Sequence, residues 1–272
     1  MSGPFRVACV QTNAGRDFEP NIKAASELVQ RARAAGAALV LLPENVSMME
    51  PDTALARQKA CAEAAHPALD AFRELARAAD VWLVVGSLSV LVDGDKIANR
   101  SYLIDASGEI AARYDKIHLF DVDLSAGERY RESDTIAAGA RAVVAPTPWG
   151  ALGLSICYDL RFPKLYRHLA HQGADFLSIP AAFTRTTGQA HWHILIRARA
   201  IENGCFVFAP AQTGTHAKGR QTYGHALIVD PWGEVLADAG EEVGFIVADI
   251  DPAKVADARA RIPALMHERP FA

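Results

Sequence analysis

Three segments of the chain place a side chain capable of catalysis at or near the end of an apolar, strand-like run. Glu44 directly follows the apolar run 37–43, Lys116 lies in the aromatic stretch 114–121, and Cys157 ends the run 151–157. Catalytic groups of layered α/β folds tend to lie just past the carboxyl ends of strands. These three residues are therefore the first candidates for a chemical role.

The chemistry that each group could do follows from its setting. Burial disfavours the charged form of a carboxyl group, so the pKa of Glu44 could rise to the range of a general base. A lysine among apolar residues is costly to bury unless it meets a negative charge, and stabilising an anion during a reaction would give Lys116 such a role. A thiol at a strand-to-helix turn becomes a nucleophilic thiolate when a base or a cation lies nearby.

Each of these residues also has an explanation without catalysis. Glu44 could cap a helix or lie at the surface, and Lys116 could extend its amine along an apolar surface into solvent. A cysteine is commonly a small buried apolar residue, which suits Cys9 and Cys205 within their predicted strands. Cys157 differs from these two because a polar turn follows it directly.

The turn after Cys157 contains Asp159 and Arg161, whose spacing predicts a local pair that fixes the turn. The segment before it lacks the closing glycine of a serine nucleophile elbow, because Cys157 occupies that position. The chain has no GxGxxG, P-loop or HExxH motif. His191 and His193 are two residues apart on a predicted helix, where their side chains diverge, so we expect neither a metal site nor a cofactor.

Composition indicates an ordinary globular protein. The 272 residues are 50% hydrophobic and 22% charged, enough apolar material for a large core. The 28 basic and 32 acidic residues give a net charge of -4, which lacks the basic excess that binds nucleic acid. No apolar run reaches the roughly 18 residues of a membrane span, so we expect no membrane partner. Four scattered cysteines and no visible secretory signal predict a reducing, cytoplasmic location.

Apolar runs of strand length alternate with segments of helical periodicity along the chain. The predicted strands are residues 5–10, 37–42, 81–86, 99–104, 109–116, 151–157, 174–179, 205–209, 226–229, 234–237 and 245–250, with a hairpin over residues 231–233. The predicted helices are residues 21–36, 54–79 with a break near His66 and Pro67, 164–173, 189–203 and 252–261. This alternation predicts an α/β layered fold, and the absence of a linker predicts one domain over residues 1–272.

Together and in this order, the three segments resemble the signature motifs of the nitrilase superfamily of carbon–nitrogen hydrolases. The matching residues are 41–45 around Glu44, 114–121 around Lys116 and 157–163 from Cys157. The resemblance covers nearly the whole chain. It is strongest to the Nit branch, which includes deaminated glutathione amidase and ω-amidase, through residues 130–133, 187–192, 197–203, 223–225 and 230–233. Residues 211–216 look more like the deaminated glutathione amidase side.

The resemblance implies a fold and an oligomer. It implies a four-layer α-β-β-α sandwich, in which two sheets pack face to face with helices outside. Members of the family usually pair through the helices after the nucleophile, which here are residues 164–173 and 189–203. We therefore expect a homodimer or a larger homo-oligomer.

The resemblance also implies a role for each site residue. Cys157 would be the nucleophile, and Glu44 would accept the thiol proton, protonate the departing ammonia and later activate water. Lys116 and the backbone N–H of Tyr158 would stabilise the tetrahedral oxyanion. Glu132 would orient Lys116 and the substrate amide. This chemistry needs no cofactor.

The expected reaction is hydrolysis of the terminal amide of a small, carboxylate-bearing molecule similar to deaminated glutathione, giving an acid and ammonia through a cysteine thioester. Alternatives on the same residues are an ω-amidase acting on α-ketoglutaramate, an N-carbamoyl amino acid hydrolase and a nitrilase. A non-enzymatic protein that kept the fold for an interaction is a further alternative, which the presence of all three catalytic residues disfavours.

A carboxylate-bearing substrate would need a cation or convergent hydrogen-bond donors near the pocket mouth. Arg185, Arg220 and His191 are the candidates for this contact. Arg220 lies in a predicted loop, where a solvated side chain is the favoured explanation, and His191 could cap the start of a helix.

Overall fold

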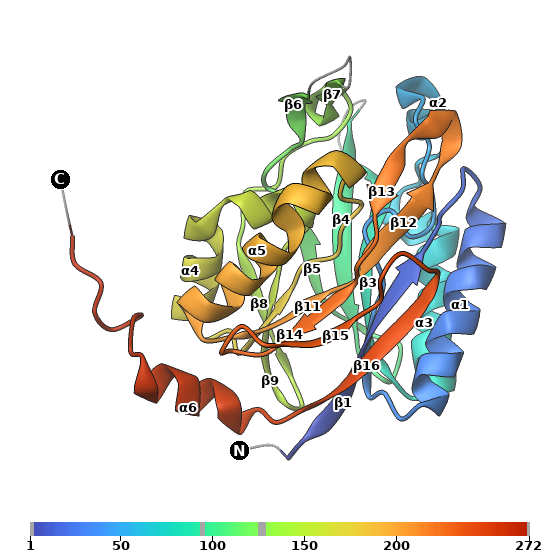
Figure 1. Ribbon diagram of the computed structural model, residues 1–272. Coiled ribbons are helices and arrows are strands. Elements are labelled where there is room, and N and C mark those ends of the chain that lie inside the picture. Colours follow the sequence, from blue (N-terminus) through green and yellow to red (C-terminus); the bar gives the residue numbers. More distant parts are fainter. Residues whose placement is uncertain (1–2, 93–95, 125–128, 271–272) are drawn as a thin grey trace.

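The computed structural model describes residues 3–92, 96–124 and 129–270 (Figure 1). Two β-sheets lie face to face and helices cover the outer face of each, so the molecule has four layers in the order α-β-β-α. One outer layer contains α1 (Phe18–Ala34) and α3 (Pro67–Ala79), and the other contains α4 (Pro163–His171) and α5 (Arg185–Asn203). The sandwich that the family resemblance implied is therefore confirmed.

The larger sheet comes mostly from the first half of the chain. Its strands are β1 (Phe5–Thr12), β2 (Leu39–Leu41), β3 (Trp82–Leu91), β4 (Ile97–Ile104), β5 (Ile110–Asp115), β12 (Ala211–Thr215), β13 (Gln221–Tyr223) and β16 (Gly244–Ile250). Their order is β13-β12-β1-β2-β3-β4-β5, and β16 pairs antiparallel with β1. Because β1, β2 and β3 are parallel, their carboxyl ends meet at one edge, where Glu44 follows β2.

The smaller sheet comes from the second half of the chain and has the order β15-β14-β11-β10-β9-β8. Its strands are β8 (Val143–Thr147), β9 (Gly150–Leu154), β10 (Phe176–Ser178), β11 (Phe206–Ala209), β14 (Leu227–Val229) and β15 (Val235–Asp238). The parallel strands β9, β10 and β11 bring Cys157 to their carboxyl ends. The antiparallel pair of β14 and β15 confirms the predicted hairpin.

Strand β1 shows how the layers share their apolar residues. Val7 and Cys9 belong to the core between the two sheets, whereas Ala8 and Val10 belong to the core under α1 and α3. Successive side chains of a strand point to opposite faces, so a strand buried on both faces appears in the sequence as a continuous apolar run. Strand β2, which precedes Glu44, is buried at every residue, so the loop that carries Glu44 is anchored in the core.

The predicted helix over residues 54–79 is divided into three pieces. These are α2 (Thr53–Lys59), a 3-10 turn (Glu63–Ala65) and α3. The break is longer than the expected one near His66 and Pro67, because the carbonyl of Cys61 accepts a hydrogen bond of 2.9 Å from the N–H of Leu91 in β3. Pro67 then begins α3, a position at which its missing N–H costs nothing.

Other boundaries differ in ways that matter for the site. Strand β9 ends at Leu154, so Cys157 lies outside the strand that was predicted to contain it. Helix α5 begins at Arg185, four residues before the predicted start, in a segment whose Thr and Gly residues have low helix propensity. The short strands β8, β12 and β13 were not predicted, and neither was the ribbon of β6 (Asp121–Asp123) and β7 (Arg129–Arg131).

The last helix is α6 (Ala253–Arg261), which agrees with the prediction to within one residue at its start. None of the helices in the described ranges combines the length and the apolar character that crossing a membrane requires.

Candidate active site

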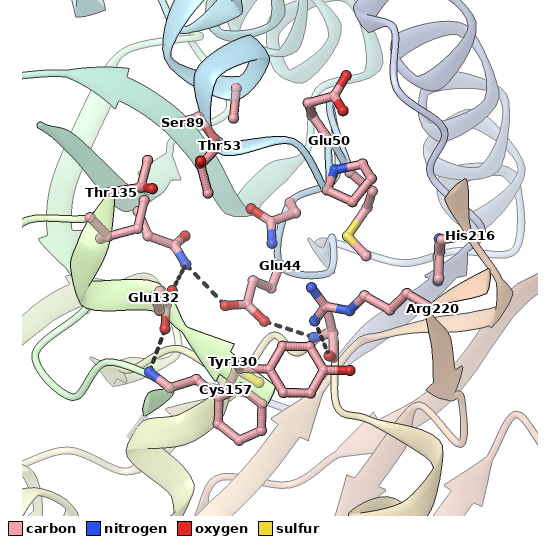
Figure 2. Close-up of a pocket in the computed structure, with 18 of the residues that line it drawn as sticks. Glu44, Glu50, Thr53, Ser89, Tyr130, Glu132, Thr135, Cys157, His216 and Arg220 are labelled. Carbon is pink, nitrogen blue, oxygen red and sulfur yellow. Dashed lines mark hydrogen bonds between the residues drawn. The ribbon is translucent and has the colours of Figure 1, made fainter. Parts of the chain in front are cut away.

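The four residues expected to do catalysis line one cavity of about 790 Å³. Figure 2 shows Glu44, Glu132 and Cys157 directed into it from different elements. Glu44 is 3% exposed, Lys116 is 2% exposed and Cys157 is 8% exposed. Two acids, an amine and a thiol from four segments of the chain therefore meet at the wall of one cavity, and Glu132, whose side chain is 17% exposed, is the acid nearer to solvent.

Lys116 lies between the two carboxylates. Its Nζ donates to Oε1 of Glu44 at 2.9 Å and to both carboxylate oxygens of Glu132 at 3.0 and 2.9 Å. The Nδ2 of Asn99, in β4, bridges the same pair, with 3.0 Å to Glu44 and 3.2 Å to Glu132. With both acids ionised, the cluster of Glu44, Lys116 and Glu132 carries one net negative charge.

Backbone donors fix the second oxygen of each carboxylate. The N–H of Ala182 donates to Oε2 of Glu44 at 2.8 Å, and the N–H of Phe120 donates to Oε2 of Glu132 at 2.6 Å. The side chain of Gln212 also donates to the backbone carbonyl of Glu44 at 3.0 Å. Both carboxylates are therefore held in fixed orientations before any substrate binds.

The charges in this cluster determine the protonation states. Burial opposes ionisation of Glu44, but the charge and the hydrogen bond of Lys116 outweigh it and hold the pKa of Glu44 below its usual value. Burial likewise opposes the charge of Lys116, but Glu132 and Glu44 raise its pKa above the usual range. The expectation that burial would raise the pKa of Glu44 is wrong, because it did not include the partner cation.

Cys157 is held in its neutral thiol form. Burial raises the pKa of its thiol well above the usual value, the charge of Glu44 raises it further, and Lys116 offsets part of the effect. A hydrogen bond between the thiol and the Glu44 carboxylate favours the ionised form of Glu44 and the neutral form of Cys157. At neutral pH the site therefore contains a carboxylate beside a thiol, which is the arrangement of a base ready to accept the proton of a nucleophile.

The backbone turn at Cys157 presents its side chain to the cavity. Cys157 begins a 3-10 turn (Cys157–Arg161) and has a φ of 47°, in the left-handed region that residues with a Cβ rarely occupy. Its N–H donates to the carbonyl of Pro180 at 2.9 Å. Such backbone strain is typical of functional positions that the surrounding structure holds in place.

Asp159 provides much of that support. It is fully buried and accepts hydrogen bonds from the hydroxyl of Tyr114 at 2.7 Å, the N–H of Ile156 at 2.8 Å and the N–H of His118 at 3.0 Å. The predicted local pair of Asp159 with Arg161 is therefore wrong. Asp159 instead joins the Lys116 segment to the Cys157 turn, which fixes the amine and the thiol relative to each other.

Two of the three candidates for substrate contact do not line the cavity within the described ranges. Arg185 is paired with Glu241 at 3.4 Å on the surface, and His191 is an exposed residue whose ring contacts Arg161 at 3.3 Å. His191 also lies inside α5 and does not cap its start. The third candidate, Arg220, is partly exposed and lines the cavity.

Sequence reasoning missed two further contributors. Asn99 lies inside a strand and Ala182 in the loop after β10, and neither position carries a local signal of function. The carboxyl-end position of Ala182 after a parallel strand is the one general feature that could have drawn attention to it.

A second polar cluster lies outside the cavity. His193 in α5, His225 before β14 and Asp238 in β15 bring one possible metal-ligand atom each within 4.8 Å of one another. Spacing in the sequence could not show this cluster, because three separate elements contribute to it. Both imidazole rings already contact the carboxylate, His193 at 2.9 Å and His225 at 2.9 Å, so the three side chains satisfy one another without an ion.

The fold is a four-layer sandwich, and an acid, an amine and a thiol lie together near the ends of its central strands. The sequence motifs implied a protein of this class. The model of the family described as carbon–nitrogen hydrolase matches residues 6–260. The chain therefore belongs to the carbon–nitrogen hydrolase family.

Individual relatives agree over nearly the whole chain. A protein of Synechocystis sp. named deaminated glutathione amidase is 44% identical over 269 residues, which cover 97% of this chain and 98% of that protein. The crystal structure of the Caenorhabditis elegans NitFhit protein superimposes with a TM-score of 0.91 at 39% identity, covering 98% of this chain and 66% of that one. The structure of Saccharomyces cerevisiae Nit3, a member of branch 10 of the nitrilase superfamily, gives a TM-score of 0.88 at 31% identity, covering 100% and 98%.

These similarities bear on the expectations from the sequence. The nitrilase-superfamily fold, the resemblance to its Nit branch and an enzyme of the amidase type are confirmed.

Proposed function

We propose that Cys157, Glu44, Lys116 and Glu132 are the catalytic machinery of this amidase and that its substrate is a small amide bearing a carboxylate. The observation that carries the proposal is the direct contact of Lys116 with both carboxylates in the cavity that also contains the Cys157 thiol. An ion network of this kind is costly to bury, and catalysis gives a reason for its presence.

The first half of the reaction forms a thioester. Glu44 accepts the proton of the Cys157 thiol as Sγ attacks the amide carbonyl carbon, and the carbonyl π electrons move to oxygen. Lys116 and the backbone N–H of Tyr158, the residue after the nucleophile, stabilise the tetrahedral oxyanion. As the carbonyl re-forms, the C–N bond breaks and Glu44 returns its proton to the leaving nitrogen.

The second half consumes one water molecule. Glu44 accepts a proton from water as its oxygen attacks the thioester carbon, and the C–S bond then breaks with return of that proton to the Cys157 sulfur. Glu132 holds Lys116 in place throughout, because it contacts the ammonium group through both of its oxygens. The products are a carboxylic acid and an amine or ammonia, and no cofactor takes part in any step.

The leaving group distinguishes the possible substrates. The name of the Synechocystis relative points to deaminated glutathione. Glutathione is a tripeptide whose amides are substituted at nitrogen, so its deaminated form would release an amine. An unsubstituted ω-amide such as α-ketoglutaramate would release ammonia. The release of ammonia expected above for a substrate similar to deaminated glutathione does not fit that molecule. Assays for both products are therefore needed.

The test is a substrate panel of deaminated glutathione, α-ketoglutaramate and an N-carbamoyl amino acid, with ammonia and free amine measured separately. We expect the wild-type protein to hydrolyse a carboxylate-bearing amide and Cys157→Ala to be inactive on it. Cys61→Ala is the matched control, because Cys61 does not line the cavity within the described ranges, and it should retain full activity. Equal activity of Cys157→Ala and wild type would overturn the proposal.

We also propose that two copies pair through α4 and α5. Ile194 is 70% exposed and Ile201 is 52% exposed; they lie seven residues apart on α5, so they share one face of the helix. Burying this face against a second copy would remove apolar surface from water. Light scattering after size exclusion should show a dimer or larger assembly that Ile194→Glu weakens, and a monomeric wild type would contradict the pairing.

A cytoplasmic location also stays a proposal, and the four free cysteines support it.

A further inference from the structure

The cavity contains a cation that the catalytic steps do not use. Arg220 follows a short 3-10 turn (Ala217–Gly219) between β12 and β13, and Figure 2 shows its guanidinium group reaching into the cavity near Tyr130 and Glu44. Burial, hydrogen bonds and charge at this position decide whether Arg220 is a structural residue or a binding residue.

The other cationic side chains that line the cavity, as far as the described residues show, have carboxylate partners. Lys116 is bound by Glu44 and Glu132. Arg129 and Arg131 share Asp123, with 3.4 Å and 2.5 Å between the charged atoms, and Lys218 lies 3.7 Å from Asp52. No carboxylate among the described residues lies within ion-pair distance of Arg220. Its positive charge is therefore not compensated by a direct contact.

Arg220 is nevertheless held in place. One terminal nitrogen donates to the backbone carbonyl of Ala182 at 3.0 Å, and the guanidinium lies 5.5 Å from the centre of the Tyr130 ring. Its Nε is shielded from solvent and has no hydrogen-bond partner among the described residues, so a ligand in the cavity cannot reach this donor. The terminal nitrogens keep N–H groups that do not bind Ala182, and a cation with unused donors on a fixed support is suited to an anionic ligand.

Ala182 links this cation to the reacting groups. Its carbonyl accepts from Arg220, while its N–H donates to Glu44. A single residue therefore positions Arg220 relative to the base. A ligand carboxylate bound by Arg220 would lie only a few bonds from the carbonyl carbon that Cys157 attacks.

Charge balance supports the same conclusion. The cluster of Glu44, Lys116 and Glu132 has one net negative charge, so it would repel an anionic substrate. Arg220 cancels that charge and still offers free N–H groups in the planar arrangement that matches a carboxylate. An anion can then enter without displacing a carboxylate of the protein from Lys116.

We propose that Arg220 forms the subsite for a carboxylate on the acyl side of the substrate, and that it makes the enzyme selective for amides of short dicarboxylic acids. The inference rests on the proposed function, and it names the residue that recognises the substrate class. Arg185 and His191, the other two candidates from the sequence, have no part in it.

The test uses two amides that differ only in the group Arg220 would bind. Glutaramate and pentanamide have acyl chains of the same length, and a carboxylate in the first replaces a methyl group in the second. Arg220→Met should lower kcat/KM for glutaramate about 100-fold, mainly through KM, because a charge-assisted bidentate contact is lost. Hydrolysis of pentanamide should not change. Arg185→Met, the matched control, should behave as wild type on both substrates.

Binding without turnover separates this inference from the proposed function. In the Cys157→Ala background, calorimetry should show that glutaramate binds more tightly than pentanamide and that adding Arg220→Met removes the difference. This result would support the subsite even if the wild-type protein hydrolysed neither amide, an outcome that would count against the proposed function alone.

Two results would overturn the subsite. Equal losses on glutaramate and pentanamide would show that Arg220 has a purely structural role, and an unchanged preference for glutaramate would show that another group binds the carboxylate. If Arg220→Met does not fold, Arg220→Lys keeps the charge and loses the planar pair of donors. It should retain part of the preference for glutaramate if the subsite is real and all of it if Arg220 only supports the loop.

Discussion

Two clusters of polar side chains in this protein are built alike and lie in opposite surroundings. The cluster of Glu44, Lys116 and Glu132 lines the cavity, and its side chains are 4%, 2% and 17% exposed. The cluster of His193, His225 and Asp238 lies on the outside, where its side chains are 34%, 22% and 33% exposed. Each cluster joins three segments distant in the sequence around shared hydrogen bonds.

The difference lies in what the surroundings do to charge. Burial opposes ionisation of both Glu44 and Asp238, and in both cases partner groups outweigh it and hold the pKa below the usual value. Near the surface, water screens any charge that the partner groups do not balance, whereas the charges of buried side chains are screened much less. We therefore expect the same kind of substitution to have much larger effects in the buried cluster.

The largest effect should come from Glu44→Gln. The amide keeps the shape of the carboxylate but cannot accept the thiol proton, so kcat should fall by about 10²–10⁴-fold. Asp238→Asn makes the same chemical change in the exposed cluster and should leave kcat unchanged. Steady-state kinetics on the best amide of the panel measures both. Similar losses in the two variants would remove the functional distinction between the clusters.

Lys116→Met should have the largest effect on stability. It leaves two adjacent buried carboxylates without their cation, and breaking a buried ion pair in this way costs about 3–5 kcal/mol. Urea unfolding at neutral pH measures the loss, and His193→Gln in the exposed cluster is the control with a small expected change. Adding Glu132→Gln to Lys116→Met should recover part of the stability, because it removes one of the two repelling charges. No recovery would mean that the carboxylates do not repel each other in the variant.

Sequence motifs identified the reacting groups but not the residues that arrange them. Glu44, Lys116 and Cys157 stand out because each follows or interrupts an apolar run, and an unusual residue there is visible in the sequence itself. Asn99 and Ala182 both bind the carboxylate of Glu44 but lie 55 and 138 positions from it in the sequence. Contacts of such separation depend on how the sheets pack, and local periodicity contains no information about that.

The errors have the same origin. Asp159 and Arg161 were paired because they are neighbours in the sequence, yet Asp159 binds residues of the Lys116 segment 41 and 45 positions away. The loop position of Arg220 favours a solvated side chain, because loops are usually at the surface. Residues 216–220 of this loop line the cavity, and the pairing of β12 with β1 and β13, which no local pattern predicts, places them there.

The pH dependence of stability should also distinguish the clusters. The pKa of Glu44 is lower in the folded state than its usual 4.5, so its stabilising contribution is complete above that pH and is lost as the pH falls through the folded value. The pKa of Lys116 is raised above its usual 10.5, so its contribution is complete below that pH and is lost only as the pH rises through the folded value. Between these limits the buried cluster should contribute a constant stability.

Urea unfolding from pH 7 down to pH 3 tests the acidic limit. Glu44→Gln should lose less stability than wild type over this range, because the group that takes up the proton is gone. Asp238→Asn should flatten the acidic loss in the same direction but by less, since solvent screens its interactions. A steeper acidic loss in Glu44→Gln than in wild type would mean that the pKa of Glu44 is raised on folding.

The smallest effect should come from Asp238→Asn measured by thermal unfolding at neutral pH. The Asp238 carboxylate contacts two imidazole rings and the N–H of Gly240. Water can replace the carboxylate as the hydrogen-bond partner of each of these groups in the variant. Exposed interactions of this kind contribute about 0–1 kcal/mol, so the loss should stay within that range. Two imidazoles and a carboxylate are also ligands that zinc accepts. If zinc raised the melting temperature of the wild type and not of Asp238→Asn, the exposed cluster would be a zinc site. Exposure to solvent would then no longer account for the difference between the two clusters.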